Sequence, residues 1–164
     1  MNTVKKQNAT LTHVDEAGAA NMVDVSDKPI TSRSAVAEGY ISISQDALAQ
    51  IARNNNAKGD VLSVARIAGI QAAKKCSDLI PLCHPLMLSK VQVDFTLDDE
   101  NSQVQVNSLC RLTGQTGVEM EALTAVSVAC LTLFDMCKAA DPAMEIFGIK
   151  VLTKEGGKSG KWQA

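Results

Sequence analysis

Hydrophobic residues alternate with polar ones in several segments of the chain, with the two-residue period that is typical of β-strands. The pattern runs through residues 91–97 (VQVDFTL) and residues 104–112 (VQVNSLCRL), and it marks the end of residues 35–44 (AVAEGYISIS). The polar residues DDENSQ, between the first two segments, predict a hairpin turn. A closing strand is expected over residues 144–154 (MEIFGIKVLTK).

Three other segments repeat hydrophobic residues with the period of an α-helix. The first spans residues 44–55 (SQDALAQIARNN), with Ser44 as its expected N-cap. The second spans residues 58–76 (KGDVLSVARIAGIQAAKKC), with Asp60 as its N-cap. The third runs from about residue 117 to residue 140 and is apolar almost all round, which predicts a buried helix.

The order of these elements is strand, helices, strand, strand, helix, strand. This order predicts an α+β protein with the ferredoxin-like β-α-β-β-α-β fold, an antiparallel sheet with helices on one face. Residues 1–20 are polar and aperiodic, and we expect them to form a flexible N-terminal segment. Residues 21–164 are expected to form a single ferredoxin-like domain that carries the catalytic residues.

The composition narrows the classes of function. A net charge of −2 and an aromatic content of 3% argue against nucleic-acid binding and against attraction to anionic membranes. No apolar run is long enough to span a membrane, and the N-terminus lacks the apolar stretch of a secretion signal. The five cysteines lie in apolar surroundings without a CxxC pair, which predicts reduced thiols, a cytoplasmic protein and no zinc site.

The few charged residues of the long apolar helix need an explanation, because burying a charge is costly. Glu119 can be explained by a capping box with Thr116, which has the T-x-x-E spacing, or by a role in ligand binding. Glu121 has no such local explanation. Asp135 and Lys138 share a helix face, where they form either a structural pair or part of a site.

Glu121 and Asp135 lie fourteen residues apart on this helix, so about 21 Å separates them. One small ligand cannot touch both carboxylates within a single chain. A second copy of the helix could bring the start of one chain near the end of another. The spacing therefore indicates a site built across an interface between subunits.

Basic residues offer candidates for binding an anion. Lys58 precedes the helix start at Asp60, where backbone N–H groups favour an anion, although a solvated loop lysine is the alternative. The segment GGKSG (156–160) resembles the end of a phosphate loop, but Leu152 replaces the required earlier glycine and no helix follows. What remains is a basic tail, with Lys154 and Lys158, that can fold over a phosphate.

The segment DLIPLCHPL (78–86) places His84 between two prolines in an apolar run. Pro81 and Pro85 restrict the backbone, which would suit a ring that must be aimed at a ligand. With an ordinary pKa near ~6.5, a histidine exchanges protons at neutral pH. A purely structural histidine is the alternative.

These motifs together resemble one family, the cyclic pyranopterin monophosphate synthases (molybdenum cofactor biosynthesis protein C). The resemblance is carried by LTHVDEAGAANMVDVSDK, by KGDVLSVARIAGIQAAKKCSDLIPLCHPLMLSKV, by LCRLTGQTGVEMEALTAVSVACLTLFDMCKA and by GGKSG. These segments span about residues 11–160 in the family's order. No functional position of the family pattern is altered.

The resemblance implies a lyase that converts 3′,8-cyclo-7,8-dihydroguanosine triphosphate to cyclic pyranopterin monophosphate and pyrophosphate, in molybdenum cofactor biosynthesis. It also implies a homohexamer, a trimer of dimers, with active sites at the dimer interface. No redox cofactor is needed for a rearrangement of this kind. Mg²⁺ can accompany the substrate phosphates, but no protein motif binds it alone.

The resemblance also implies roles for particular residues. The catalytic candidates are Asp135, Lys58, Lys138 and His84. The candidates for binding the guanine-derived part of the substrate are Leu82, Cys83, His84, Glu119, Met120 and Glu121. The triphosphate is assigned to Lys28, Arg33, Lys154 and Lys158, while Asp24 has no defined role and His13 is expected to join when substrate orders its segment.

Two other functions compete with this reading. A non-enzymatic ferredoxin-like module that binds an anionic metabolite would need the basic residues but not Asp135. An RNA-binding module would need aromatic residues on its middle strands, where Phe95 is the only aromatic residue of the predicted pair.

Overall fold

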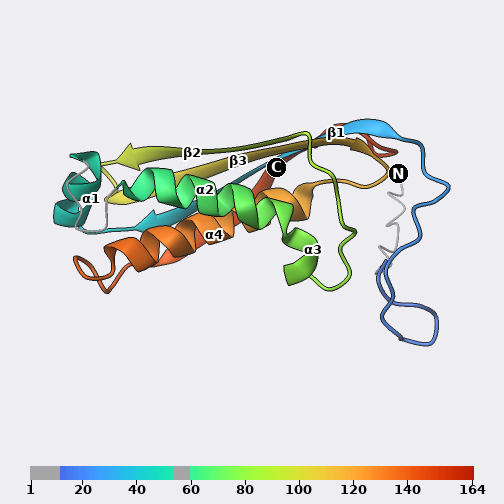
Figure 1. The fold of residues 1–164 in the computed structure, drawn as a ribbon, viewed down its shortest axis with the longest axis horizontal. Helices are drawn as coiled ribbons and strands as arrows, with labels where there is room; N and C mark the ends of the chain where they lie inside the picture. The colour runs from blue at the N-terminus through green and yellow to red at the C-terminus, as the bar shows by residue number, and fades with distance from the viewer. Residues whose placement is uncertain (1–11, 54–59) are drawn as a thin grey trace, which may run out of the picture.

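A computed structural model describes residues 12–53 and 60–164 (Figure 1). The predicted elements are present in the predicted order. The strands and helices are β1 (Thr31–Ser42), α1 (Gln45–Ala52), α2 (Val61–Lys74), α3 (Cys76–Leu79), β2 (Lys90–Asp98), β3 (Gln103–Gly114), α4 (Glu119–Cys137), β4 (Ile146–Glu155) and β5 (Trp162–Gln163).

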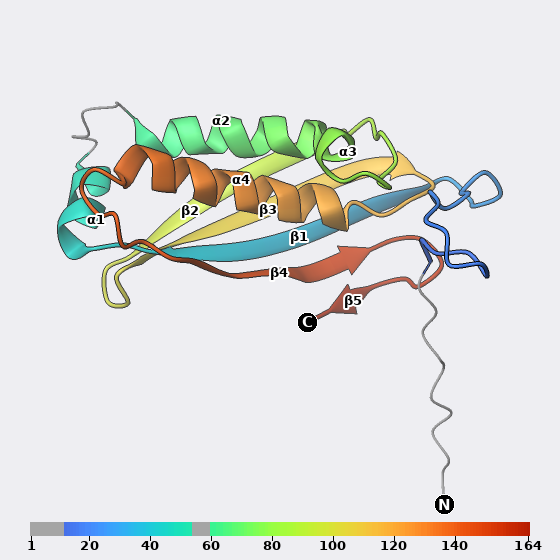
Figure 2. The ribbon, with the colours of Figure 1, turned by 90° about the horizontal axis from the view of Figure 1, so that it is seen from below.

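The strands form one antiparallel sheet in the order β2-β3-β1-β4-β5. Helices α2 and α4 lie side by side along one face of this sheet (Figure 2). Helix α4 contacts β1, β3 and β4, and helix α2 contacts β2. The first four strands have the arrangement of the split β-α-β-β-α-β unit, so the predicted ferredoxin-like α+β fold is confirmed.

The core lies between the sheet and the two long helices. In β1, the fully buried Ala35, Ala37 and Ile41 face the helices, and the alternate Glu38 and Tyr40 lie on the opposite face. Gly69 of α2 lies so close to α4 that an added Cβ would come within 2.9 Å of the Ala125 backbone oxygen. A glycine at this position therefore allows the two helices to pack closely.

Helix α4 is the one described helix that is long and apolar enough to cross a membrane by length and composition. It packs instead against α2 and three strands of the sheet. Its buried side chains include Glu121, which is 3% exposed. These contacts are those of a core helix.

The predicted N-caps of both shorter helices are confirmed. The Ser44 hydroxyl accepts a hydrogen bond from the backbone of Ala47, and the Asp60 carboxylate accepts one from the backbone of Ser63. Of the two explanations offered for Glu119, the capping box is wrong. The N-cap of α4 is Val118, and no side chain caps that helix end.

Two differences concern the ends of the sheet. Strand β1 begins at Thr31, four residues before the predicted start, because Thr31 to Ser34 pair with the end of β3. These residues lack an alternating apolar pattern, so the sequence does not indicate that they belong to the strand. The basic tail contains a strand that the sequence pattern does not predict, β5, which pairs with Thr153 and Lys154. A strand of two residues is too short to have a visible period. Residues 12–21 form a turn closed by a bridge between Val14 and Ala20, and the expected boundary at residue 20 stays a prediction.

Candidate active site

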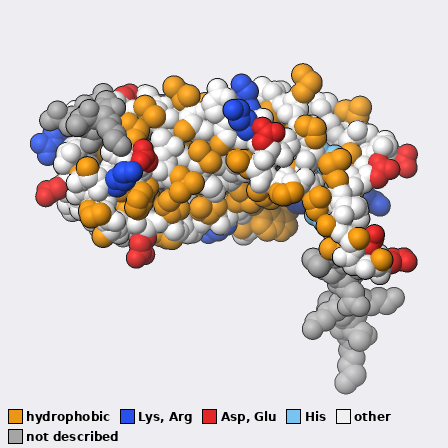
Figure 3. Space-filling view, turned by 60° about the horizontal axis from the view of Figure 1, so that its bottom comes forward, with side chains coloured by type: hydrophobic (Ala, Val, Ile, Leu, Met, Phe, Trp, Pro, Cys, Tyr) orange, Lys and Arg blue, Asp and Glu red, His pale blue; other side chains and the backbone are white. Residues whose placement is uncertain are grey.

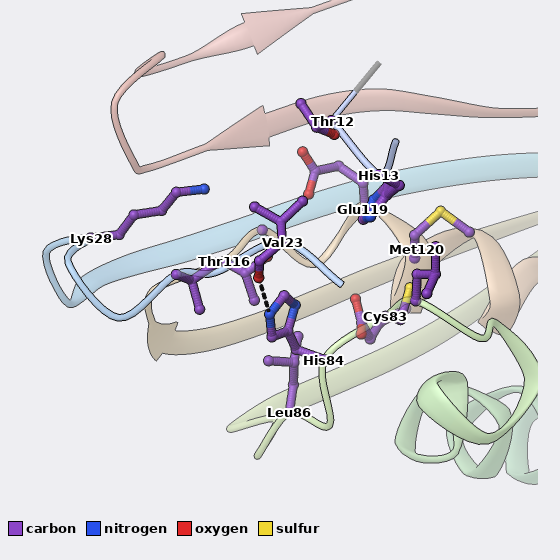
Figure 4. Close-up of a pocket in the computed structure, with 14 residues that line it drawn as sticks. Thr12, His13, Val23, Lys28, Cys83, His84, Leu86, Thr116, Glu119 and Met120 are labelled. Atoms are coloured by element: carbon purple, nitrogen blue, oxygen red, sulfur yellow. Dashed lines mark hydrogen bonds between the residues drawn. The ribbon is translucent and has the colours of Figure 1, made fainter. Parts of the chain in front are cut away.

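A cavity of about 280 Å³ lies at the N-terminal end of α4. Three segments form it: the N-terminal residues 12–28, the loop that follows α3, and the first turn of α4 (Figure 4). Most of the predicted substrate-binding residues meet here. The lining residues are Thr12, His13, Val23, Val25, Lys28, Leu82, Cys83, His84, Leu86, Thr116, Gly117, Glu119, Met120 and Glu121.

The imidazole of His84 is held in one orientation by a backbone contact. Its Nε2 atom lies 2.8 Å from the carbonyl oxygen of Val23, as the dashed line in Figure 4 shows. A carbonyl oxygen only accepts hydrogen bonds, so Nε2 is the donor and carries the proton. In the neutral ring Nδ1 is then an acceptor that can take a proton from a ligand.

Both histidines of the chain line this one cavity, because His13 lies on the N-terminal segment that crosses it. The backbone of Asn21 donates to the carbonyl of His13, which holds that turn in place. The sequence motif containing His13 therefore reaches the same cavity as the segment containing His84. The expectation that substrate orders this segment stays a prediction.

The segment that delivers Lys28 is fixed by polar contacts. The Asp24 carboxylate accepts hydrogen bonds from the backbone and hydroxyl of Ser26, and these bonds lower the pKa of Asp24. The side-chain amide of Gln115 donates to the carbonyls of Ser26 and Lys28, each at 3.0 Å. Asp24 and Gln115 thus hold Lys28 beside the start of α4.

Glu121 is a buried carboxyl group at the base of this cavity. Burial raises the pKa of Glu121, and the nearby Glu119 raises it further. Burial and the charge of Glu121 in turn raise the pKa of the Cys83 thiol. A raised pKa keeps the Cys83 thiol protonated at neutral pH.

In the wild type, the free energy of unfolding is expected to fall as pH rises, because Glu121 ionises. Glu121→Gln is expected to remove this fall. Burial raises the pKa of Glu121 above its ordinary 4.5, so the unfolded chain ionises first as pH rises. Between the unfolded and folded pKa values the native state binds more protons, and the free energy of unfolding falls by at most about 1.4 kcal/mol per pH unit. Urea denaturation of both proteins from about pH 4 upward measures this difference. Equal pH dependence in the two proteins would contradict it.

Glu119 also belongs to a second group of residues, which lies next to the cavity. Its carboxylate lies 3.0 Å from the Lys154 ammonium, so it forms an ion pair in place of the predicted cap. Trp162, the only tryptophan in the chain, lines a hollow with Glu119 and Lys154. Lys154 is thereby held at the edge of the first cavity, which is called the His84 cavity from here on.

A larger and more cationic cavity, of about 590 Å³, adjoins the first. Lys28 lines both cavities, and Figure 4 shows it at the outer edge of the first. The residues lining the second are Asp27, Lys28, Pro29, Thr31, Arg33, Gly157, Lys158 and Ser159. This second cavity, called the cationic cavity from here on, thus brings together three of the four cations assigned to the triphosphate.

Arg33 is fixed in this cationic cavity from two sides. Its Nε donates to the carbonyl of Gly114 at 3.0 Å. On the other side, Gly156 and Gly157 have positive φ angles, and a Cβ on Gly157 would collide with the Arg33 guanidinium. The glycine pair of the GGKSG segment therefore serves to bring the tail against Arg33.

Two of the remaining catalytic candidates, Asp135 and Lys138, lie at the C-terminal end of α4, opposite the cavity. Asp135 and Lys138 pair at 2.7 Å, with 61% and 54% of their side chains exposed. About 21 Å of helix separates Asp135 from Glu121, so this chain alone does not bring Asp135 to His84. Lys58 lies outside the described residues, just before the N-cap of α2 at Asp60.

Sequence reasoning missed several residues that line the two cavities. Apart from Thr31, which begins β1, these residues lie on loops without hydrophobic periodicity, so only their closeness to Lys28 and His84 indicates them. They are Thr12, Val23, Val25, Asp27, Pro29, Thr31, Leu86, Thr116, Gly117, Gly157 and Ser159. Within residues 12–53 and 60–164, no three His, Cys, Asp or Glu side chains are grouped as metal ligands.

Comparisons with known proteins identify the family. The MoaC family model matches residues 22–157. The chain is 59% identical to the cyclic pyranopterin monophosphate synthase of Brucella ovis over 152 residues, covering 93% of this chain and 92% of the relative. It is 57% identical to the synthase of the same name from Cereibacter sphaeroides, covering 94% of this chain and 97% of the relative.

One solved structure, of the ferredoxin protease FusC in complex with Arabidopsis ferredoxin, matches 65% of this chain and 10% of that chain. The match has 14% identity and a TM-score of 0.31, which is below the level that indicates a shared fold. The relatives, by contrast, match nearly end to end and have the activity that the motifs predicted. The chain therefore belongs to the MoaC family, and the predicted activity of a cyclic pyranopterin monophosphate synthase, a lyase of molybdenum cofactor biosynthesis, is confirmed.

Proposed function

We propose that the His84 cavity binds the ring system of 3′,8-cyclo-7,8-dihydroguanosine triphosphate and that the cationic cavity binds its triphosphate. The observation that carries this proposal is that Lys28 lines both cavities. A ligand lying past Lys28 would have its polar ring on one side and its phosphates on the other. This division fits a nucleotide-derived substrate.

Pyrophosphate release is the step for which the cationic cavity is suited. A hydroxyl oxygen of the substrate gives up its proton to a base, forms a bond to the α-phosphorus and closes the cyclic phosphate, while the bond from that phosphorus to the pyrophosphate oxygen breaks. Negative charge then gathers on the departing pyrophosphate. Lys28, Arg33 and Lys158 line the cavity in which that charge would develop, and fixed cations of this kind stabilise a transition state.

The ring system would be held by the residues around His84. Nδ1 of His84 is available to accept a proton, and the buried Glu121 and the backbone of residues 82–84 offer polar contacts. Lys154 can leave Glu119 for a phosphate, since a phosphate oxygen is a charged acceptor like the carboxylate that it replaces. Cys83 contributes shape and is not a nucleophile.

Asp135, Lys138 and Lys58 would reach the ring system from a second chain. The distance of Asp135 and Lys138 from His84 within one chain supports a site shared by two subunits. The outer surfaces of α2 and α4 also expose Val64, Ile67 and Leu131, at 44%, 60% and 58%. Figure 3 shows hydrophobic side chains exposed across the middle of the molecule, which is typical of a surface that meets another chain.

The complete assembly would be a homohexamer, a trimer of dimers, acting in the cytoplasm. Mg²⁺ would enter with the phosphates, because the substrate oxygens are its preferred ligands. A non-enzymatic module is not favoured, because the relatives that match the chain end to end are named as synthases. An RNA-binding module is not favoured either, since Phe95 is the one aromatic residue on β2 and β3.

Incubating the wild type with the cyclised nucleotide is expected to release one pyrophosphate for each pterin product formed. The equality follows because one α-phosphorus bond breaks for each cyclic phosphate that closes. A coupled phosphate assay measures the first product, and fluorescence after oxidation measures the second. Pterin formation without pyrophosphate, or no turnover at all, would contradict the proposed reaction.

A further inference from the structure

The hydroxyl of Thr31 is an unusual group in this fold. It is the one buried side-chain oxygen or nitrogen, among the residues that the structure describes, without a hydrogen-bond partner. Less than 1 Å² of this oxygen is accessible, so water does not reach it in this conformation. A buried polar group without a partner is costly, and native proteins rarely retain one without a reason.

Thr31 lies where the phosphates are expected. It is the first residue of β1 and pairs with Gly114 at the end of β3. Arg33 lies two residues further along the strand, so both side chains lie on the same face of the sheet. Thr31 lines the cationic cavity together with Lys28, Arg33 and Lys158.

A single side-chain rotation would give this hydroxyl a partner. A change of about 120° in χ1 moves the threonine hydroxyl to the staggered position that the methyl held and moves the methyl to that of the hydrogen, and more than one staggered rotamer is common in strands. The residue already lines the cavity, so such a rotation can turn the hydroxyl toward a bound ligand. A phosphate oxygen is a charged acceptor and forms a stronger hydrogen bond than a neutral group does.

We propose that Thr31 is a phosphate-binding residue whose hydroxyl turns into the cationic cavity and donates to a phosphate oxygen of the substrate or of pyrophosphate. The inference rests on the proposed function, which puts the phosphates in this cavity. It adds a neutral donor to a site otherwise described by its cations. The hydroxyl is buried without a hydrogen-bond partner in this structure, and a bound phosphate would give it one.

Isothermal titration with inorganic pyrophosphate tests this role in the wild type and in two variants. Thr31→Val keeps the shape of the side chain and removes the donor, so its affinity is expected to fall by about tenfold to hundredfold. Thr31→Ser keeps the donor and is expected to bind within a few fold of the wild type. The midpoint of thermal unfolding of Thr31→Val without ligand is expected to equal or exceed that of the wild type, because the methyl needs no partner.

Three outcomes would overturn the inference. Wild-type affinity in Thr31→Val would show that the hydroxyl does not touch the phosphate. Equal losses of affinity in Thr31→Val and Thr31→Ser would show that packing, and not the donor, is responsible.

The third outcome separates this inference from the proposed function. Arg33→Ala is titrated in parallel, because Arg33 lines the same cavity. If the wild type binds pyrophosphate no better than Arg33→Ala, the phosphate site itself is refuted, and the role of Thr31 with it. If Arg33→Ala loses affinity while Thr31→Val does not, the role of Thr31 alone is wrong.

Discussion

Asp135→Asn is expected to lose turnover by about a hundredfold to ten-thousandfold, which is the usual contribution of a positioned acid or base. The substitution removes the charge and keeps the shape of the side chain. Asp135 pairs with Lys138 on the surface of this chain, with 61% of its side chain exposed. Such a pair contributes little to stability, so the fold is expected to survive the change.

The loss should affect chemistry and not the binding of phosphate. In the proposed shared site Asp135 reaches the ring system, and it is not among the residues that line the cationic cavity. Single-turnover kinetics with the cyclised nucleotide should show the loss, while titration with pyrophosphate should give wild-type affinity. Circular dichroism of the variant checks that its secondary structure is unchanged.

Asp46→Asn is a matched control for this experiment. Asp46 is also an exposed carboxylate on a helix, in the first turn of α1, and it lines neither of the two cavities. Its variant is expected to turn over like the wild type. Full turnover by Asp135→Asn would mean that this carboxylate is only a structural charge and would contradict its catalytic role.

Most of the fold was predictable because its elements bury one face or are buried all round. The alternation in β2 and β3 and the apolar length of α4 follow directly from their positions in the core. Ser44 and Asp60 were recognisable as N-caps because their side chains satisfy backbone groups locally. The T-x-x-E spacing at Glu119 has the local form of a capping box, but Lys154, which is distant in sequence, binds that carboxylate instead.

The candidate site was predictable in part. The segments around His84 and Glu121 do meet, and Lys28 joins them as expected. The division into two cavities that share Lys28 depends on how loops pack in space, which no local pattern reports. The unpartnered hydroxyl of Thr31 becomes visible only when every buried donor and acceptor has been placed.

Mixing two inactive variants tests the central claim, that each active site takes residues from two chains. His84→Ala removes the imidazole from the cavity beside the N-terminal end of α4, and Asp135→Asn removes the carboxylate near the C-terminal end of that helix. Each variant alone is expected to be inactive, because every site then lacks one of the two groups. In a mixed dimer with twofold symmetry, one site lacks both groups and the other is intact.

Co-refolding equal amounts of the two variants is the measurement, with pyrophosphate release as the readout. Random pairing makes half of the dimers mixed, with one intact site of two, so about a quarter of wild-type activity is expected to return. Light scattering of the same sample checks that the chains have assembled. A mixture no more active than the sum of the two separate variants would contradict the shared site and would require Asp135 and His84 to act independently.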